Sequence, residues 1–197
     1  MIKLIIQAIR QTLVWTLITG VVYPVAFTVF AQLAFKRQAD GSLVERDGKL
    51  VGSELLAQQF QGPTYFWPRP SAASYGTGPS GLSASSGSNL GPTSAQLQTN
   101  VRGNAKSLRD AHKLAADAPV PADLVYASAS GLDPHISPEA ARFQVARVAA
   151  ARGVGEDKVR ELVEKFVEAP QWGFLGEARV NVLLLNLALD AADARKA

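Results

Sequence analysis

The feature that most constrains this chain is a run of 25 residues, Gln11 to Phe35, that contains no charged side chain. Basic residues flank the run on both sides. A helix rises about 1.5 Å per residue, so this run can cross a hydrocarbon layer of roughly 30 Å. A helix also satisfies its own backbone hydrogen bonds in lipid, which a lone strand cannot do. The sequence therefore predicts a short N-terminal segment at 1–10, a transmembrane helix at 11–35 and an extramembrane domain at 36–197.

Pro24 lies in the middle of this predicted helix, next to Tyr23 and four residues after Gly20. Proline has no N–H, so the carbonyl of Gly20 loses its partner and the helix is expected to kink there. A freed carbonyl in a membrane usually finds a partner on a neighbouring helix, which hints at a partner within the bilayer. The alternative is that Pro24 is one of the prolines that membrane helices commonly tolerate.

A cleaved signal peptide is the alternative to a permanent anchor. The apolar run is much longer than the signal-peptide core of roughly 7 to 15 residues, and the segment 31–34 lacks the spacing of a cleavage site. These features favour an uncleaved anchor. Long domains can cross a membrane regardless of flanking charge, so the basic residues on both sides leave the orientation open.

Composition narrows the classes of function. The 20 basic and 17 acidic residues give only a small positive excess, and the basic residues are scattered, which argues against nucleic-acid binding. The chain has no cysteine, which excludes disulfides, thiolate metal sites and a cysteine nucleophile. Its histidines, His112 and His135, are too few for a multi-histidine metal site, and we expect no structural metal.

The first part of the domain contains a hairpin signal and an aromatic string. Two short runs, 41–46 and 49–51, are separated by Asp47-Gly48, a dipeptide that suits a tight hairpin turn. Ser53 is placed to cap a short helix that Gly62-Pro63 ends. The string Tyr65-Phe66-Trp67 follows, and we interpret it as core rather than as a ligand platform.

The segment from Ser71 to Gly91 is rich in Ser, Gly and Ala and has no periodicity. This composition favours a flexible linker. The alternative is an ordered loop with a functional surface, in which the backbone amides of Gly87-Ser88-Asn89 form an anion-binding nest.

The rest of the domain reads as helices with short extended segments. Apolar spacing and cap signals predict helices from Pro92 to about Asp117, from Ser137 to Gly153, from Glu156 to about Val167 and after Asn181. Leu124 to Tyr126 reads as a buried strand, and 131–134 as a turn. The predicted fold class is α+β: one N-terminal transmembrane helix followed by a single mixed domain with a hairpin, short strands and about four helices.

Asp133 and His135 form the one local pair that could carry acid–base chemistry, because their spacing suits a general base and its orienting group. The structural alternative is that Asp133 makes an Asx-type turn before Pro134 while His135 supports the start of the next helix. His112, beside the apolar face of its helix, is interpreted as structural. The sequence has no nucleophile elbow, P-loop, zinc-protease or kinase signature. The residues thus indicate a binding or assembly subunit rather than an enzyme.

Five strings occur in a fixed order behind the span: Gly41-Ser42-Leu43, Tyr65-Phe66-Trp67 with Arg69-Pro70-Ser71-Ala72, Ser88-Asn89-Leu90-Gly91-Pro92, SASGLDPHIS at 128–137, and Leu175-Gly176-Glu177 with RVNVL at 179–183. In this order they resemble the C subunit of the Kdp high-affinity potassium-transporting ATPase, over nearly the whole chain. Each string alone is moderately specific, and five in order are hard to reach by accident. Two loop strings depart from the family pattern. In Trp67-Pro68-Arg69 the family more often has Gly at the middle position, and in Glu177-Ala178-Arg179 it more often has Pro there.

The resemblance implies a bacterial inner-membrane complex with three partners: a channel-like potassium-binding subunit, a catalytic P-type ATPase subunit and a small single-helix subunit. ATP, magnesium and potassium are then bound by the complex, and this chain has no cofactor and no catalytic residue of its own. The resemblance implies that this chain is needed for assembly and stability of the complex. It also implies a role as a catalytic chaperone that raises the ATP affinity of the ATPase subunit. The single anchor and the lack of a phosphate-binding motif favour a periplasmic domain without direct ATP contact.

The resemblance also marks family-motif positions as candidate contacts with the partner subunits, namely Tyr65, Phe66, Trp67, Arg69, Asn89, Asp133, His135 and Asn181, and Pro24 as the transmembrane kink. Alternatives from other classes are a signal-anchored periplasmic hydrolase that uses Asp133 and His135, and an anchored sensor or scaffold domain. The hydrolase predicts activity from the soluble domain alone, whereas the subunit predicts a domain that is inert without its membrane partners.

Overall fold

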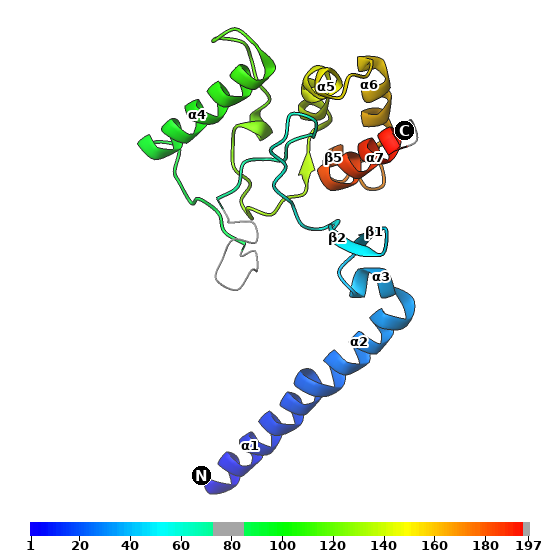
Figure 1. The fold of residues 1–197 in the computed structure, drawn as a ribbon. Helices are drawn as coiled ribbons and strands as arrows, with labels where there is room; N and C mark the ends of the chain where they lie inside the picture. The colour runs from blue at the N-terminus through cyan, green and yellow to red at the C-terminus, as the bar shows by residue number, and fades with distance from the viewer. Residues whose placement is uncertain (73–84, 195–197) are drawn as a thin grey trace. The chain divides into compact units, whose positions relative to one another are not determined.

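The computed structural model describes residues 1–72 and 85–194. The chain divides into two compact units, Met1–Ser53 and Glu54–Ala197. Figure 1 shows the elements of each unit in chain order. The predicted division into 1–10, 11–35 and 36–197 is a division by membrane position, and it stays a prediction.

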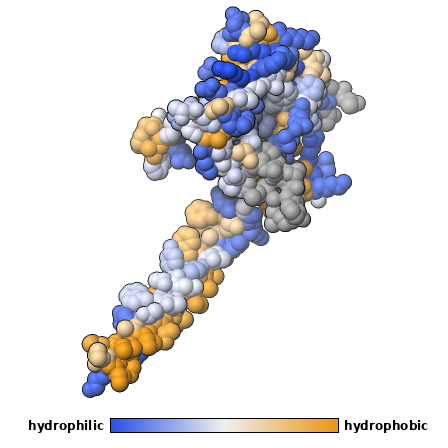
Figure 2. All heavy atoms as spheres, turned by 90° about the vertical axis from the view of Figure 1, so that its left-hand side faces the viewer, coloured by the Kyte–Doolittle hydropathy of each residue, from blue (hydrophilic) through white to orange (hydrophobic). Residues whose placement is uncertain are grey.

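The first unit begins with a long apolar helix. It consists of α1 (Ile2–Leu17), a π-helical turn η1 (Ile18–Val22) and α2 (Tyr23–Ala34). The combined helix, Ile2–Ala34, has 33 residues and is long and apolar enough to cross a membrane. Its most apolar stretch of 18 residues is not buried inside the protein. Figure 2 shows its apolar side chains exposed along the rod. An apolar surface of this size is stable in lipid and costly in water, which makes the helix a candidate membrane span. It starts earlier than the apolar run, because the segment 1–10 is also helical.

The helix is irregular next to Pro24. In η1 the N–H of Tyr23 donates to the carbonyl of Ile18, five residues back instead of four. Proline cannot donate to the carbonyl of Gly20, and a π-turn is one way in which a helix accommodates such a break. The disturbance therefore lies where the sequence predicts it, while the bend itself stays a prediction.

The predicted hairpin is confirmed. After a single helical turn, α3 (Lys36–Ala39), strands β1 (Leu43–Arg46) and β2 (Lys49–Ser53) pair antiparallel with Arg46 opposite Lys49. Asp47 and Gly48 both have positive φ, 53° and 72°, as a type I′ turn requires.

The predicted helix after Ser53 is wrong. Ser53 ends β2, and its hydroxyl donates to the carbonyl of Gly41 at 2.7 Å instead of capping a helix. Leu55 and Leu56 are exposed, so the helix would have had no apolar partner to pack against. Packing of an apolar face supplies most of the stability of a short helix, and without it the segment stays irregular.

The second unit contains four α-helices in its described part: α4 (Ala95–His112), α5 (Pro138–Arg152), α6 (Glu156–Lys165) and α7 (Val182–Ala194). Strands β3 (His135–Ile136), β4 (Val167–Glu168) and β5 (Arg179–Asn181) form an antiparallel sheet in the order β3-β5-β4. Figure 1 shows α5, α6 and α7 grouped together and α4 on the other side of the unit. The predicted α+β class is confirmed.

Cap residues set the boundaries of α5 as predicted, whereas α4 is shorter at both ends than predicted and begins after Ser94. The hydroxyl of Ser137 accepts from the N–H of Ala140 at 3.0 Å, and Gly153 ends α5 in the left-handed conformation. The predicted strand Leu124 to Tyr126 is wrong. A short 3-10 helix, η2 (Ala122–Leu124), occupies its start, because the amides of Leu124 and Tyr126 bond locally, to the carbonyls of Pro121 and Ala122.

The core of the second unit gathers apolar side chains from all four helices and the sheet around Phe66, which is fully buried. The largest fully buried members are Phe66, Val145, Val148, Val163, Val180, Val182 and Leu185. Gln144 on α5 and Asn186 on α7 are buried among them, and these two amides hold the backbone of the aromatic string. Asn186 accepts from the N–H of Phe66 at 2.8 Å and donates to its carbonyl at 3.0 Å. Gln144 does the same for Trp67, at 2.8 and 3.1 Å.

These paired amides generate the first prediction. Asn186→Leu leaves a buried N–H and a buried carbonyl of Phe66 without partners, and each such group costs about 1 to 3 kcal/mol. We expect the free energy of unfolding to fall by about 3 kcal/mol in thermal or urea unfolding of the full chain in detergent. Gln98→Leu, which also replaces a side-chain amide by leucine but at an exposed position of α4, is the control. Equal stability of the two variants would contradict the structural role of Asn186.

Candidate functional site

The aromatic string is also held by a buried arginine on α5. Arg147 is only 8% exposed, and its guanidinium donates to the carbonyls of Pro63 at 2.7 Å and Tyr65 at 3.0 Å. It lies 4.0 Å above the ring of Trp67, a cation–π contact. Within residues 1–72 and 85–194, no carboxylate oxygen comes within 4.0 Å of Arg147. Burial lowers the pKa of Arg147 to about 10, so it stays charged at neutral pH and is stabilised by neutral oxygens and an aromatic face.

His112 completes this cluster. Its Nε2 accepts from Nε of Arg147 at 3.2 Å, and its ring lies 4.4 Å from that of Phe143, centroid to centroid. Burial and then the charge of Arg147 lower the pKa of His112 to about 4. The residue is therefore a neutral acceptor in the core at neutral pH, which agrees with its structural interpretation.

A second arginine of α5, Arg152, covers the other end of the string. It donates to the carbonyl of Thr64 at 2.6 Å and forms ion pairs with Asp190 at 2.9 Å and Asp193 at 2.6 Å on α7. The hydroxyl of Tyr65 donates to Asp190 at 3.3 Å. The candidate contact residues Tyr65, Phe66 and Trp67 thus have internal partners for their backbone, their rings or both.

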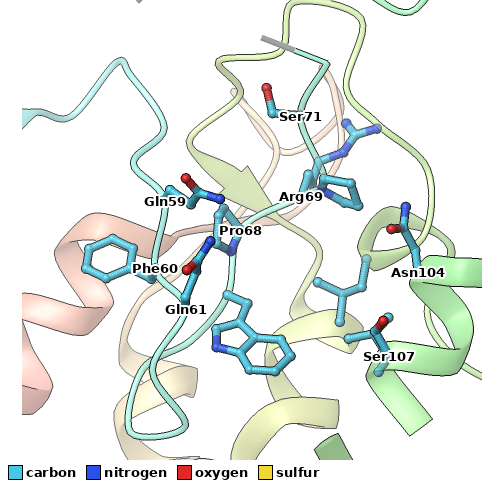
Figure 3. Close-up of a pocket in the computed structure, with 12 residues that line it drawn as sticks. Gln59, Phe60, Gln61, Pro68, Arg69, Ser71, Asn104 and Ser107 are labelled. Carbon is cyan, nitrogen blue, oxygen red and sulfur yellow. The ribbon is translucent and has the colours of Figure 1, made fainter. Parts of the chain in front are cut away.

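Arg69 borders two cavities. The first, of about 510 Å³, lies between the segment 59–71 and α4. Figure 3 shows Gln59, Phe60 and Gln61 on one side and Asn104 and Ser107 of α4 on the other. Apart from Arg69, the residues that line it are uncharged: Gln59, Phe60, Gln61, Trp67, Pro68, Pro70, Ser71, Asn104, Ser107, Leu108 and Leu124.

The second cavity, of about 650 Å³, is rich in charged groups. Its lining includes three acids, two arginines and a histidine: Asp123, Asp133, Glu177, Arg69, Arg179 and His135. Arg69 donates to Asp133 at 3.0 Å. The Nε of Arg69 is buried and has no hydrogen-bond partner among the described residues. A buried donor without a partner is costly, so this N–H is available to donate to an oxygen of a bound group.

The structure brings Asp133 and His135 together. One carboxylate oxygen of Asp133 accepts from the N–H of His135 at 3.0 Å, which is the Asx-type turn, and the same oxygen lies 3.6 Å from Nδ1 of His135. Burial raises the pKa of Asp133, but hydrogen bonds from His135 and Arg69 and the charge of Arg69 outweigh it, so the pKa is lowered. A carboxylate held in this way suits charged recognition better than general-base work, which needs a pKa near the operating pH.

The two candidate asparagines differ in accessibility. Asn181 is buried, donates to the carbonyl of Glu54 at 2.8 Å and accepts from the N–H of Leu184 at 3.2 Å, so it fixes the start of α7. Asn89 is exposed and has a φ of 51°. Its role in a partner contact or in an anion nest stays a prediction.

The described end of the predicted linker is tied to the second unit. The N–H of Ser86 donates to the carbonyl of Ser130 at 2.9 Å. A Cβ on Gly87 would lie 2.6 Å from the carbonyl of Ala129, so only glycine fits there. Residues 85–91 are thus an ordered loop, and the central part of the predicted linker, 73–84, lies outside the described residues.

Four polar residues stabilise the fold but were not predicted from the sequence: Gln144, Arg147, Arg152 and Asn186. A signal was present for two of them. Gln144 precedes Val145 in the apolar face of its helix, and Asn186 interrupts the apolar run LLLNLAL. A polar side chain at a core-facing position indicates a buried hydrogen-bond partner, although the sequence does not say which one.

Together these features define a class: a chain with one candidate membrane span and an α+β domain whose charged and amide residues hold its own structure and line two cavities. The chain matches the family of the K+-transporting ATPase c chain, KdpC, over residues 5–191, and it belongs to this family. It is 56% identical to the potassium-transporting ATPase KdpC subunit of Methylococcus capsulatus, over 93% of this chain and 95% of that one. The KdpC subunits of Polaromonas naphthalenivorans (58% identical, 90% and 89% covered) and Sorangium cellulosum (55%, 94% and 96%) are similarly related. The resemblance noted from the motif strings is confirmed.

The pKa of His112 generates a prediction of pH dependence. The unfolded chain binds a proton on this residue below its ordinary pKa of 6.5, whereas the folded chain does so only below about 4. The free energy of unfolding therefore falls as the pH is lowered from 6.5 towards 4, and this residue adds no pH dependence above 6.5. His112→Gln keeps an acceptor for Arg147 but cannot titrate. Its melting temperature should fall less steeply across this window than that of the natural chain, and parallel curves would contradict the lowered pKa.

Proposed function

We propose that this chain is a non-catalytic accessory subunit of an ATP-driven potassium-uptake complex, and that the complex needs it for assembly and stability. The observation that carries the proposal is the family match over residues 5–191, together with relatives that are named as KdpC subunits of a potassium-transporting ATPase. The single apolar helix supports a membrane subunit. The internal use of Arg147, Arg152 and Asn186 supports a domain built to be rigid.

The proposal extends to the partners and to the side of the membrane. In it, a channel-like subunit binds potassium, a P-type ATPase subunit holds ATP and magnesium at the catalytic site, and a small single-helix subunit completes the complex. The second unit lies in the periplasm of a bacterial inner membrane. The lack of a phosphate-binding motif supports this side, because ATP is cytoplasmic. In the alternative role, as a catalytic chaperone, this chain would raise the ATP affinity of the ATPase subunit through contacts between the subunits.

A signal-anchored periplasmic hydrolase is the second candidate, and the 3.6 Å approach of Asp133 and His135 is the observation in its favour. The lowered pKa of Asp133 and its occupied oxygens argue against it. The two candidates differ in what they expect from loss of the carboxylate.

Asp133→Asn separates these candidates. If Asp133 is structural, the change removes the ion pair with Arg69 and lowers the free energy of unfolding by about 1 to 2 kcal/mol. The ATPase activity per assembled complex then stays near that of the natural complex. If Asp133 and His135 are an acid–base pair, folding is nearly intact and turnover falls by about a hundredfold or more. Melting temperature and activity normalised to assembled complex decide between them, and we expect the structural outcome.

The subunit assignment is tested by capture of the full chain through a C-terminal tag in mild detergent. We expect the potassium-binding, ATPase and small subunits to be recovered with it. Protease added to intact spheroplasts tests the side of the membrane: the second unit should be digested while the cytoplasmic part of the ATPase subunit survives. Capture of the chain alone would overturn the subunit assignment, and a protected second unit would overturn the orientation.

A further inference from the structure

A short turn between β4 and β5 presents apolar side chains to solvent. Residues 170–176, which we call the aromatic tip, have the sequence Pro-Gln-Trp-Gly-Phe-Leu-Gly. Gln171 and Leu175 exchange both backbone hydrogen bonds, each at 2.9 Å. Between them, Trp172 is 86% exposed, Phe174 74% and Leu175 44%. Two large aromatic rings on so small a surface are costly in water and mark a site of interaction.

The backbone of the aromatic tip has a fixed and unusual conformation. Trp172 has a φ of 53°, in the left-handed region that a bulky residue rarely adopts, and Gly173 and Gly176 also have positive φ. The N–H of Gly173 donates to the carbonyl of Pro170 at 3.0 Å. Such a conformation persists only where its surroundings hold it, and it is commoner at functional sites. A fixed backbone presents the rings in one orientation and lowers the entropy that is lost on docking.

The aromatic tip is continuous with the charged cavity. Glu177, Ala178 and Arg179 follow it directly and line that cavity together with Arg69 and His135. An apolar centre beside charged groups is the usual arrangement of a protein–protein interface, with tryptophan and arginine as the commonest energetic anchors.

We propose that the aromatic tip inserts into an apolar pocket on the extramembrane surface of another subunit of the same ATPase complex, with Trp172 and Phe174 as anchors. This inference rests on the proposed function, because it requires partner subunits. A lipid surface is less suited, since a fluid interface needs no fixed backbone and residues 169–176 carry no Lys or Arg to attract anionic headgroups. A second copy of this chain is also less suited, because both cavities that Arg69 borders include its charged guanidinium, and the second also holds three acids and another arginine.

The natural absence of cysteine allows a direct test. Gln171→Cys places one thiol in the aromatic tip and keeps all three apolar side chains, and Asp117→Cys places one on an exposed segment elsewhere in the second unit. Each variant is labelled with a charged maleimide in nanodiscs, once as the isolated chain and once in the complex. We expect labelling of Gln171→Cys to be on the order of tenfold slower in the complex, and labelling of Asp117→Cys to be unchanged.

Three outcomes would overturn the inference. Equal labelling of Gln171→Cys in the complex and in the isolated chain would show that the aromatic tip is free. Protection in the isolated chain at one copy per nanodisc would assign the aromatic tip to lipid. Protection that arises only with two copies per nanodisc would assign it to self-association.

A second variant tests the energetic role. Trp172→Ser with Phe174→Ser should lower recovery of the partner subunits by about tenfold, with an unchanged melting temperature of the isolated chain, since both rings are exposed. Leu114→Ser, at an exposed leucine outside the aromatic tip, is the matched control. If the natural chain recovers no partner, the proposed function fails. If the natural chain recovers partners and the double variant recovers them equally, only the role of the aromatic tip fails.

Discussion

The second unit depends on the way in which side chains of α5 and α7 satisfy the backbone of residues 63–67. This segment passes through the core without a strand partner, so its polar groups would be unpaired unless side chains reached them. Gln144 and Asn186 each supply a donor and an acceptor, and Arg147 supplies two donors. Each unpaired group would cost about 1 to 3 kcal/mol, so the register of both helices is fixed relative to Phe66. Apolar packing alone would allow α5 and α7 more than one position relative to Phe66, whereas these hydrogen bonds allow one.

The position of Arg69 follows from this arrangement. Arg69 lies two residues after Trp67, whose N–H and carbonyl are both bound by Gln144. The chain is therefore fixed where it emerges from the core, and Arg69 is held at the boundary of the two cavities, within 3.0 Å of Asp133. Against the opposing effect of burial, His135 contributes most to the lowered pKa of Asp133, and the smaller contribution of Arg69 depends on this placement by the buried amides.

Local signals predicted the elements that local physics controls. Asp47-Gly48 predicted the hairpin because both residues tolerate positive φ, and Ser137 and Gly153 predicted the limits of α5 because caps act within one turn. Ser53 misled, because its hydroxyl is used by Gly41 across the hairpin. The contact between Phe66 and Asn186 joins residues 120 apart in sequence, and nothing local to either residue specifies it. The sequence predicted the pair Asp133 and His135, because a local turn brings these two residues together. It did not predict the roles of Gln144 and Arg147, because their partners lie far away in the sequence.

The internal use of the motif residues limits what can face another protein. Phe66 and Asn181 are buried, and the rings of Tyr65 and Trp67 each contact an arginine of α5. These internal contacts hold the core, and a role of these residues at an interface stays a prediction. Among residues 1–72 and 85–194, the groups accessible to another protein include the charged cavity around Arg69 and the exposed rings of the aromatic tip beside it. In the proposed docking, recognition depends on these accessible groups, while the contacts of Gln144 with Trp67 keep the nearby Arg69 in place.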